Sequence, residues 1–122
     1  MRLGPIALMV GAMVLGTPSV GLCNYYFSGE QVFNWCKSDK SDELALCVGF
    51  VAAAADSMNL SKEFKFVLTT PICIPKIPAK SLVDRATIWL EKHPKERSYP
   101  AVTSIQLAFI EMFPCGFDGN AR

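Results

Sequence analysis

The chain has 122 residues, enough for one domain, and 51% of them are apolar, enough to build a core. Its 12 basic and 11 acidic residues nearly balance. Because neither a basic patch nor a charge run occurs, the composition argues against a nucleic-acid partner and against an anionic membrane surface.

The first 21 residues have the layout of a secretory signal peptide. Arg2 precedes the apolar run Ile6–Leu15, and the small residues Ser19 and Gly21 stand where a signal peptidase reads the chain. A membrane anchor needs about 20 apolar residues, and this run is shorter, so no stable membrane insertion is expected. The sequence therefore predicts a signal peptide at 1–21 and one mature domain at 22–122, folded in an oxidising compartment.

Two helices are predicted next. Ser28 and Gln31 have the spacing of a capping box, which indicates a short helix from Ser28 to Cys36. A polar turn follows, and Ser41 caps a second, longer helix that extends to about Asn59.

The second helix is the element around which the rest of the chain is expected to pack. Its stretch Leu44–Met58 is apolar almost all the way round, which is typical of a helix covered on several sides. Gly49, Ala52 and Ala53 suggest a face of small residues that another helix approaches closely. A lone Asp56 on such a helix costs several kcal/mol unless it is paired, so we expect a buried, hydrogen-bonded carboxylate.

The second half of the chain contains two more predicted helices. The segment Leu60–Leu68 is ambiguous between a strand and a helical turn, and a proline-rich connector follows it. A helix is predicted over Lys80–His93, and a last helix, capped by Ser98, ends before Pro114. The predicted fold is all-α: a small disulfide-stapled bundle of about four helices around a central buried helix.

Five cysteines remain in the predicted mature chain, so two bridges and one leftover thiol are expected. Cys36 ends the first helix and Cys47 lies one turn into the second, so a short hairpin brings them together. Cys73 on the connector and Cys115 after the last helix are then natural partners. Cys23 is left free or intermolecular. Because no C-x-x-C pair occurs, no metal site is expected.

The sequence offers few candidate catalytic groups. His93 is the only histidine, and its position at a helix end explains it without chemistry. Asp56 has the structural explanation given above. We therefore predict no enzyme, no catalytic residue and no cofactor, with a small enzyme that uses Asp56 or His93 as a minor alternative.

Six short motifs occur in a recognisable order. They are the dipeptide Trp35–Cys36, the C-x-G-F motif of Cys47 to Phe50 with Asp56 after it, CIP at Cys73–Pro75, W-L-E-K-H-P at Trp89–Pro94, R-x-x-P-A at Arg97–Ala101, and FPC at Phe113–Cys115. In this order and spacing the chain resembles the Rap1a/Tai family of bacterial immunity proteins, over about residues 27–115.

The resemblance implies a small, exported, all-helical protein of the periplasm. Members of the family bind and block peptidoglycan amidase effectors that type VI secretion systems deliver, and they often form homodimers. Residue by residue, the resemblance carries over the family's cysteines and its structural positions: Cys36, Cys47, Cys73, Cys115, Gly49, Asp56, Pro94 and Pro114. The chain departs from the family at Ala53, where a glycine is more usual.

The resemblance does not locate the partner-binding surface. The segment Leu60–Leu68 matches nothing in the family, so Phe64 and Phe66, with Lys62 and Lys65 beside them, are the predicted partner contacts. The alternative to an immunity protein is a periplasmic helical binding or chaperone-like module with no toxin partner.

Overall fold

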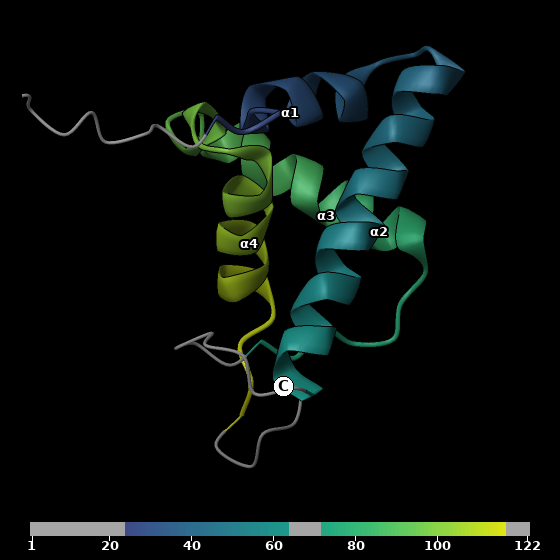
Figure 1. Ribbon diagram of the computed structural model, residues 1–122. Coiled ribbons are helices and arrows are strands. Elements are labelled where there is room, and N and C mark those ends of the chain that lie inside the picture. Colours follow the sequence, from purple (N-terminus) through teal and green to yellow (C-terminus); the bar gives the residue numbers. More distant parts are fainter. Residues whose placement is uncertain (1–23, 64–71, 117–122) are drawn as a thin grey trace, which may run out of the picture.

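The computed structural model describes residues 24–63 and 72–116, and these form a bundle of four α-helices without a β-strand. The helices are α1 (Gly29–Lys37), α2 (Ser41–Glu63), α3 (Ala79–Lys92) and α4 (Ala101–Met112), with a short 3-10 helix, η1 (Glu96–Ser98), between the last two. Figure 1 shows α1 across the end where both α2 and α4 begin. The prediction of an all-α fold with four helices is confirmed.

The capping box at the start of α1 forms as predicted. The Gln31 backbone N–H donates to the Ser28 hydroxyl at 3.2 Å, and the Ser28 N–H donates to the Gln31 side-chain oxygen at 2.9 Å. Two backbone donors at the helix start are therefore satisfied locally. On the inner side of α1, Val32 is completely buried.

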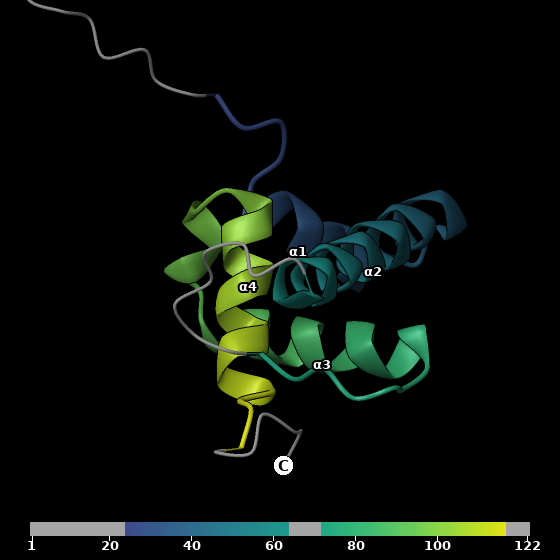
Figure 2. The same ribbon diagram turned by 60° about the horizontal axis from the view of Figure 1, so that its bottom comes forward.

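Helix α2 contacts each of the other three helices, but only one of its faces is buried. The buried face carries Cys47, Val51, Ala54, Ala55 and Met58. The prediction that α2 is covered on several sides is wrong, because α1, α3 and α4 all pack on this one face. Figure 2 shows α3 beside α2, and α4 next to both.

The opposite face of α2 corrects two further expectations. Gly49 is exposed, and a Cβ atom built on it would have no neighbour within 4 Å, so no helix approaches closely there. Asp56 is exposed as well, so its carboxylate needs no buried partner. Leu46 and Leu60 on α2 are 52% and 53% exposed. Length and apolar composition alone would allow Ser41–Leu60 to cross a membrane.

The centre of the core lies between α3 and α4. Leu90 of α3 and Ile105 and Phe109 of α4 are completely buried. Ala86 and Ala108, also fully buried, are small enough to let the two helices pack closely. These five side chains form the part of the core that holds α3 and α4 together.

The start of α4 differs from the expectation that Ser98 caps it. Ser98 belongs to η1, where its hydroxyl donates to the Lys95 carbonyl at 2.7 Å. The residue that precedes α4 is Pro100, which offers no side-chain cap. Inside the helix, the buried Ser104 hydroxyl donates to the Glu96 carbonyl at 2.7 Å and so ties η1 to α4.

Both ends of α4 are held by extended segments. At its start, the Ala101 N–H donates to the Phe27 carbonyl and the Gly29 N–H donates to the Tyr99 carbonyl, each at 2.9 Å. Beyond its end, the Cys73 N–H donates to the Phe113 carbonyl, also at 2.9 Å. These contacts fix the N-terminal segment and the connector against the same helix.

Two disulfides complete the bundle, and they are the pairs that the sequence predicts. Cys36 of α1 is bonded to Cys47 of α2, and Cys73 of the connector is bonded to Cys115 after α4. The first joins neighbouring helices, and the second closes the end of the bundle where α4 stops. Cys23 lies outside the described residues.

Candidate functional site

The predicted partner contacts remain a prediction. Phe64, Lys65 and Phe66 lie outside the described residues, and Lys62 belongs to α2 but its side chain is not described. The predicted signal peptide at 1–21 also lies outside them. The candidate site described below therefore lies on the surface of residues 24–63 and 72–116.

Two of the positions taken over from the resemblance lie just beyond helix ends. Pro94 comes two residues after α3, and Pro114 comes two residues after α4; both are exposed. Pro114 also forms an isolated β-bridge with Ile72 of the connector. Their positions fit a role in ending helices, since proline cannot continue one.

The single histidine is part of a packed helix end. His93 Nδ1 donates to the Trp89 carbonyl at 2.7 Å, and the two rings stack with centroids 3.9 Å apart. The Trp89 indole N–H donates to Glu111 at 2.8 Å, and this carboxylate lies 3.8 Å from His93 Nε2. No group of three metal-ligating side chains occurs among residues 24–63 and 72–116. His93 thus orders the junction of α3 and α4.

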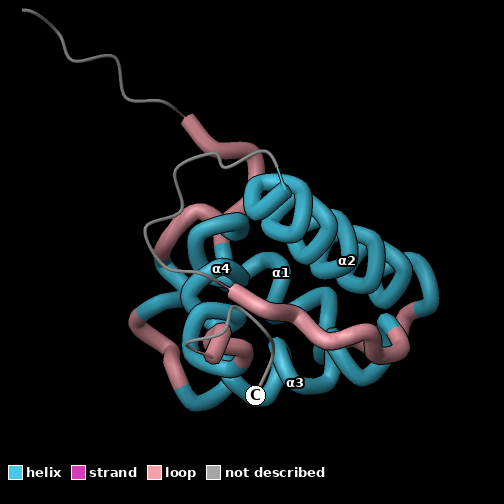
Figure 3. The backbone as a smooth tube through the Cα atoms, turned by 90° about the horizontal axis from the view of Figure 1, so that it is seen from below, coloured by secondary structure: helices cyan, strands magenta, loops and turns pink. Residues whose placement is uncertain are grey.

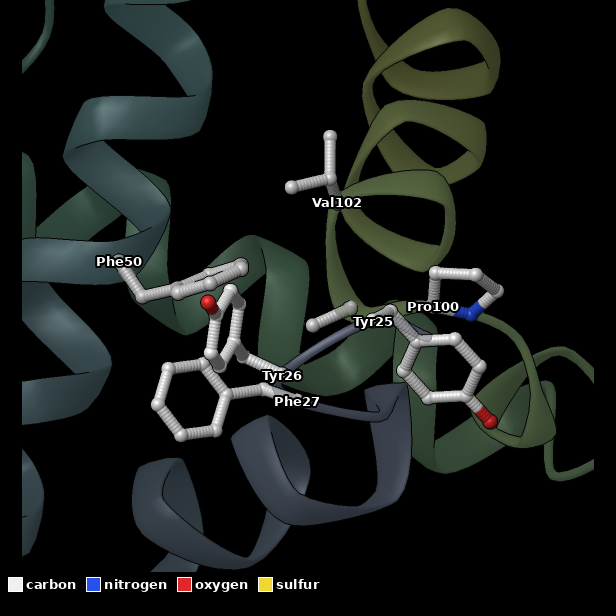
Figure 4. Close-up of a pocket in the computed structure, with 7 residues that line it drawn as sticks. Tyr25, Tyr26, Phe27, Phe50, Pro100 and Val102 are labelled. Atoms are coloured by element: carbon white, nitrogen blue, oxygen red, sulfur yellow. The ribbon is translucent and has the colours of Figure 1, made fainter. Parts of the chain in front are cut away.

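An aromatic groove lies on the surface of the described residues, and the sequence did not predict it. The groove has a volume of about 500 Å³ and runs between the N-terminal segment, α2 and the start of α4. It is lined by Tyr25, Tyr26, Phe27, Phe50, Pro100, Ala101 and Val102. Figure 4 shows Tyr26 close to Phe27 and Phe50 on one side, and Tyr25 beside Pro100 on the other. The run of three aromatic residues at Tyr25–Phe27 was the one sequence feature that pointed to this groove.

One wall of the aromatic groove is held in place by its neighbours. The Phe27 ring makes edge contacts with Trp35, at a centroid distance of 5.0 Å, and with Phe50, at 6.3 Å. Its carbonyl accepts the Ala101 N–H, so both backbone and ring of Phe27 are fixed. This preorganisation lowers the entropy that a partner's binding would cost.

The exposed aromatic side chains give the groove its binding character. Tyr26 is 94% exposed and Tyr25 is 52% exposed, while no charged side chain lines the groove. Contiguous exposed apolar surface marks protein interaction sites, and tyrosine is enriched among the residues that dominate binding energy. The groove can therefore receive an apolar or aromatic side chain from a protein partner.

Comparison with known proteins identifies the kind of partner. The sequence profile of the Rap1a immunity proteins matches residues 19–115, which is most of the chain. The chain belongs to the Rap1a immunity protein family. No curated protein and no solved structure matches it.

Rap1a immunity proteins are not enzymes, and the role of an immunity protein is to bind a toxin effector. A binding surface, rather than a reaction centre, is thus the functional site to expect in a Rap1a protein. The matched residues include both walls of the aromatic groove, from Tyr25 at one side to Val102 at the other.

Proposed function

We propose that this Rap1a protein is a periplasmic immunity protein. It binds a peptidoglycan amidase effector of a type VI secretion system and inhibits it by occluding the active site. The observation that supports this most is the exposed groove lined by aromatic and aliphatic side chains. It lies on a chain of the immunity protein family. The predicted signal peptide and the two disulfides fit the periplasm, where disulfides form and persist.

In this proposal the aromatic groove is the main contact with the effector. Tyr26, almost fully exposed, inserts between side chains of the effector at the rim of its cleft. Binding there excludes the peptidoglycan strand, so inhibition requires no chemistry from the immunity protein. Phe64 and Phe66, with Lys62 and Lys65, remain a proposed second contact.

The test directs a candidate peptidoglycan amidase effector to the periplasm of a host bacterium. Co-production of the full chain should prevent lysis. The Tyr26→Ala variant should weaken effector binding by about 2 kcal/mol, or roughly 30-fold in Kd, because exposed tyrosines at interfaces often contribute that much. Calorimetry on the purified pair measures the change.

Tyr99→Ala is the matched control. Tyr99 is 48% exposed but does not line the aromatic groove, so its removal should change Kd less than threefold. Lysis that proceeds unchanged with the wild-type chain would rule out the amidase assignment and favour the chaperone-like alternative. The implied homodimer is a separate proposal that does not depend on the effector.

A further inference from the structure

The charged residues of α3 fall into two groups. Lys80 pairs with Asp84 at 2.7 Å, and Glu91 pairs with a lysine of α1 at 3.1 Å. Arg85 and Lys92, in contrast, have no carboxylate oxygen of a described residue within 4.0 Å. Both are cations, so the charge of α3 that the described residues do not neutralise is positive.

These two cations line one groove, which we call the α3 groove. It has a volume of about 300 Å³ and lies between α3 and the end of α4. Arg85, Ile88 and Lys92 stand at positions i, i+3 and i+7 of α3, so they share one face of the helix. Ile88 is 52% exposed. This face therefore has a cation at each end and an exposed aliphatic side chain between them.

Other side chains that line the α3 groove are held in place. The rings of Trp89 and His93 stack with their centroids 3.9 Å apart, and Met112 of α4 lies in the same lining. The Arg85 guanidinium carbon lies 5.8 Å from the centroid of the Phe113 ring, a cation–π contact that positions one of the two cations. A partner therefore meets a preorganised surface, which lowers the entropy cost of binding.

One carboxylate lines the α3 groove, and it is already engaged. Glu111 accepts the Trp89 indole N–H at 2.8 Å and lies 3.8 Å from His93 Nε2. It forms no ion pair with Arg85 or Lys92. Two cations and a single carboxylate leave the lining of the α3 groove with an excess of positive charge.

A second groove, on the other side of Ile88, has no such excess. It has a volume of about 480 Å³, and its charged lining residues are Lys37, Asp84 and Glu91. Lys37 pairs with Glu91, and Asp84 pairs with Lys80. Each charge there has a partner within the chain, so the unneutralised charge of α3 is confined to the α3 groove.

The spacing of the two cations restricts the shape of an acidic partner. Seven residues of helix separate Arg85 and Lys92, which is about 10.5 Å along the axis. In a β-strand about three residues cover this length, but side chains three residues apart point to opposite faces. In an α-helix, residues seven apart cover the same length and lie on one face. A helix can therefore present a carboxylate to both cations at once.

We propose that the α3 groove binds an acidic amphipathic helix of a protein partner other than the effector. In an antiparallel arrangement, acidic residues at i and i+7 of that helix pair with Lys92 and Arg85, and an aliphatic residue at i+4 covers Ile88. Complementary charges set the register, and helices that dock in grooves use anchors at this spacing. Figure 3 shows α3 and the N-terminal segment at opposite edges of the bundle, so this helix leaves the aromatic groove open.

The probe is a synthetic alanine-rich peptide, because alanine favours helix formation. It carries glutamate at i and i+7 and leucine at i+4. NMR spectra of the isotope-labelled, disulfide-bonded chain follow two indole N–H signals. Trp89 lines the α3 groove, whereas Trp35 contacts Phe27 in the wall of the aromatic groove. The peptide should shift the Trp89 signal with a Kd below about 1 mM and leave the Trp35 signal in place.

Charge exchange tests the register. Lys92→Glu should weaken binding by about tenfold or more, because it places glutamate opposite glutamate. A peptide with lysine at i should bind the Lys92→Glu chain to within about threefold of the original pair, because it restores opposite charges at the same place. Lys40→Glu is the control: it makes the same charge change outside the α3 groove and should alter Kd less than about threefold.

Three results would overturn the proposal: no Trp89 shift at about 1 mM peptide, equal binding of a peptide with glutamine at i and i+7, or no recovery by charge exchange. A Trp89 signal that moves when the chain alone is diluted would assign the groove to a second copy, and would overturn it as well. None of these measurements uses an effector. Their failure leaves the proposed immunity function standing, and failure to bind the amidase leaves this proposal standing.

Discussion

Gly29 stands where α1 passes close to Ser104 of α4. A Cβ atom built on it would overlap the Ser104 side chain and come within 3.0 Å of the Arg97 backbone. Ser104 cannot move away easily, since it is completely buried and its hydroxyl is bonded to the Glu96 carbonyl. This contact joins α1, η1 and α4 at one point.

Gly29→Ala should therefore lower the free energy of unfolding by about 1–3 kcal/mol, the usual cost of forcing extra atoms into a packed site. Urea denaturation followed by circular dichroism measures it. Gly49→Ala is the matched control: it lies in α2 in open space, so removing a helical glycine there should stabilise the chain by about 0.5–1 kcal/mol. Equal effects at the two glycines would contradict the packing argument.

The contacts of Arg97 explain why the R-x-x-P-A motif at Arg97–Ala101 begins with an arginine. Its guanidinium carbon lies 4.3 Å from the centroid of Phe33, and its Nε lies 3.3 Å from a Glu30 carboxylate oxygen. Both partners belong to α1, so Arg97 attaches η1 to that helix by a cation–π contact and an ion pair. Among the described residues, the buried Nε has no hydrogen-bond partner.

At the scale of elements, the two disulfides constrain different lengths of chain. Cys36 and Cys47 are 11 residues apart, while Cys73 and Cys115 are 42 apart. In the chain-entropy description, their closed loops stabilise the fold by about 3 and about 4 kcal/mol.

Replacing Cys73 and Cys115 together by alanine should therefore cost more stability than replacing Cys36 and Cys47 together. Urea denaturation of the two double variants under oxidising conditions compares them. A larger loss for the Cys36–Cys47 pair would mean that packing around the buried Cys47 outweighs loop entropy.

The existence of the helices could be predicted because local chemistry determines it. The capping box of Ser28 and Gln31 begins α1, and Pro94 follows the end of α3 as expected. The exposed face of α2 could not be predicted. Alanine occurs on both of its faces, and Leu46 and Leu60 are exposed although leucine is apolar. Because exposed apolar residues are common in folded proteins, composition does not tell core from solvent.

At the scale of the whole molecule, the aromatic groove could not be predicted from the sequence, because its residues come from three separate segments. Tyr25 and Tyr26 meet Phe50 of α2 and Val102 of α4, which are far apart in the chain. No spacing rule connects three such segments. Only the packing of the N-terminal segment against α4, through the Phe27 and Ala101 backbones, brings them together.

The two ends of α4 contribute to different parts of the molecular surface. Val102 lines the aromatic groove near the start of this helix, and Glu111 accepts the Trp89 indole N–H near its end. Nine residues separate them, which places them about 14 Å apart along the axis and on opposite sides of the helix. An effector that bound in the aromatic groove would thus leave the junction of α3 and α4 uncovered.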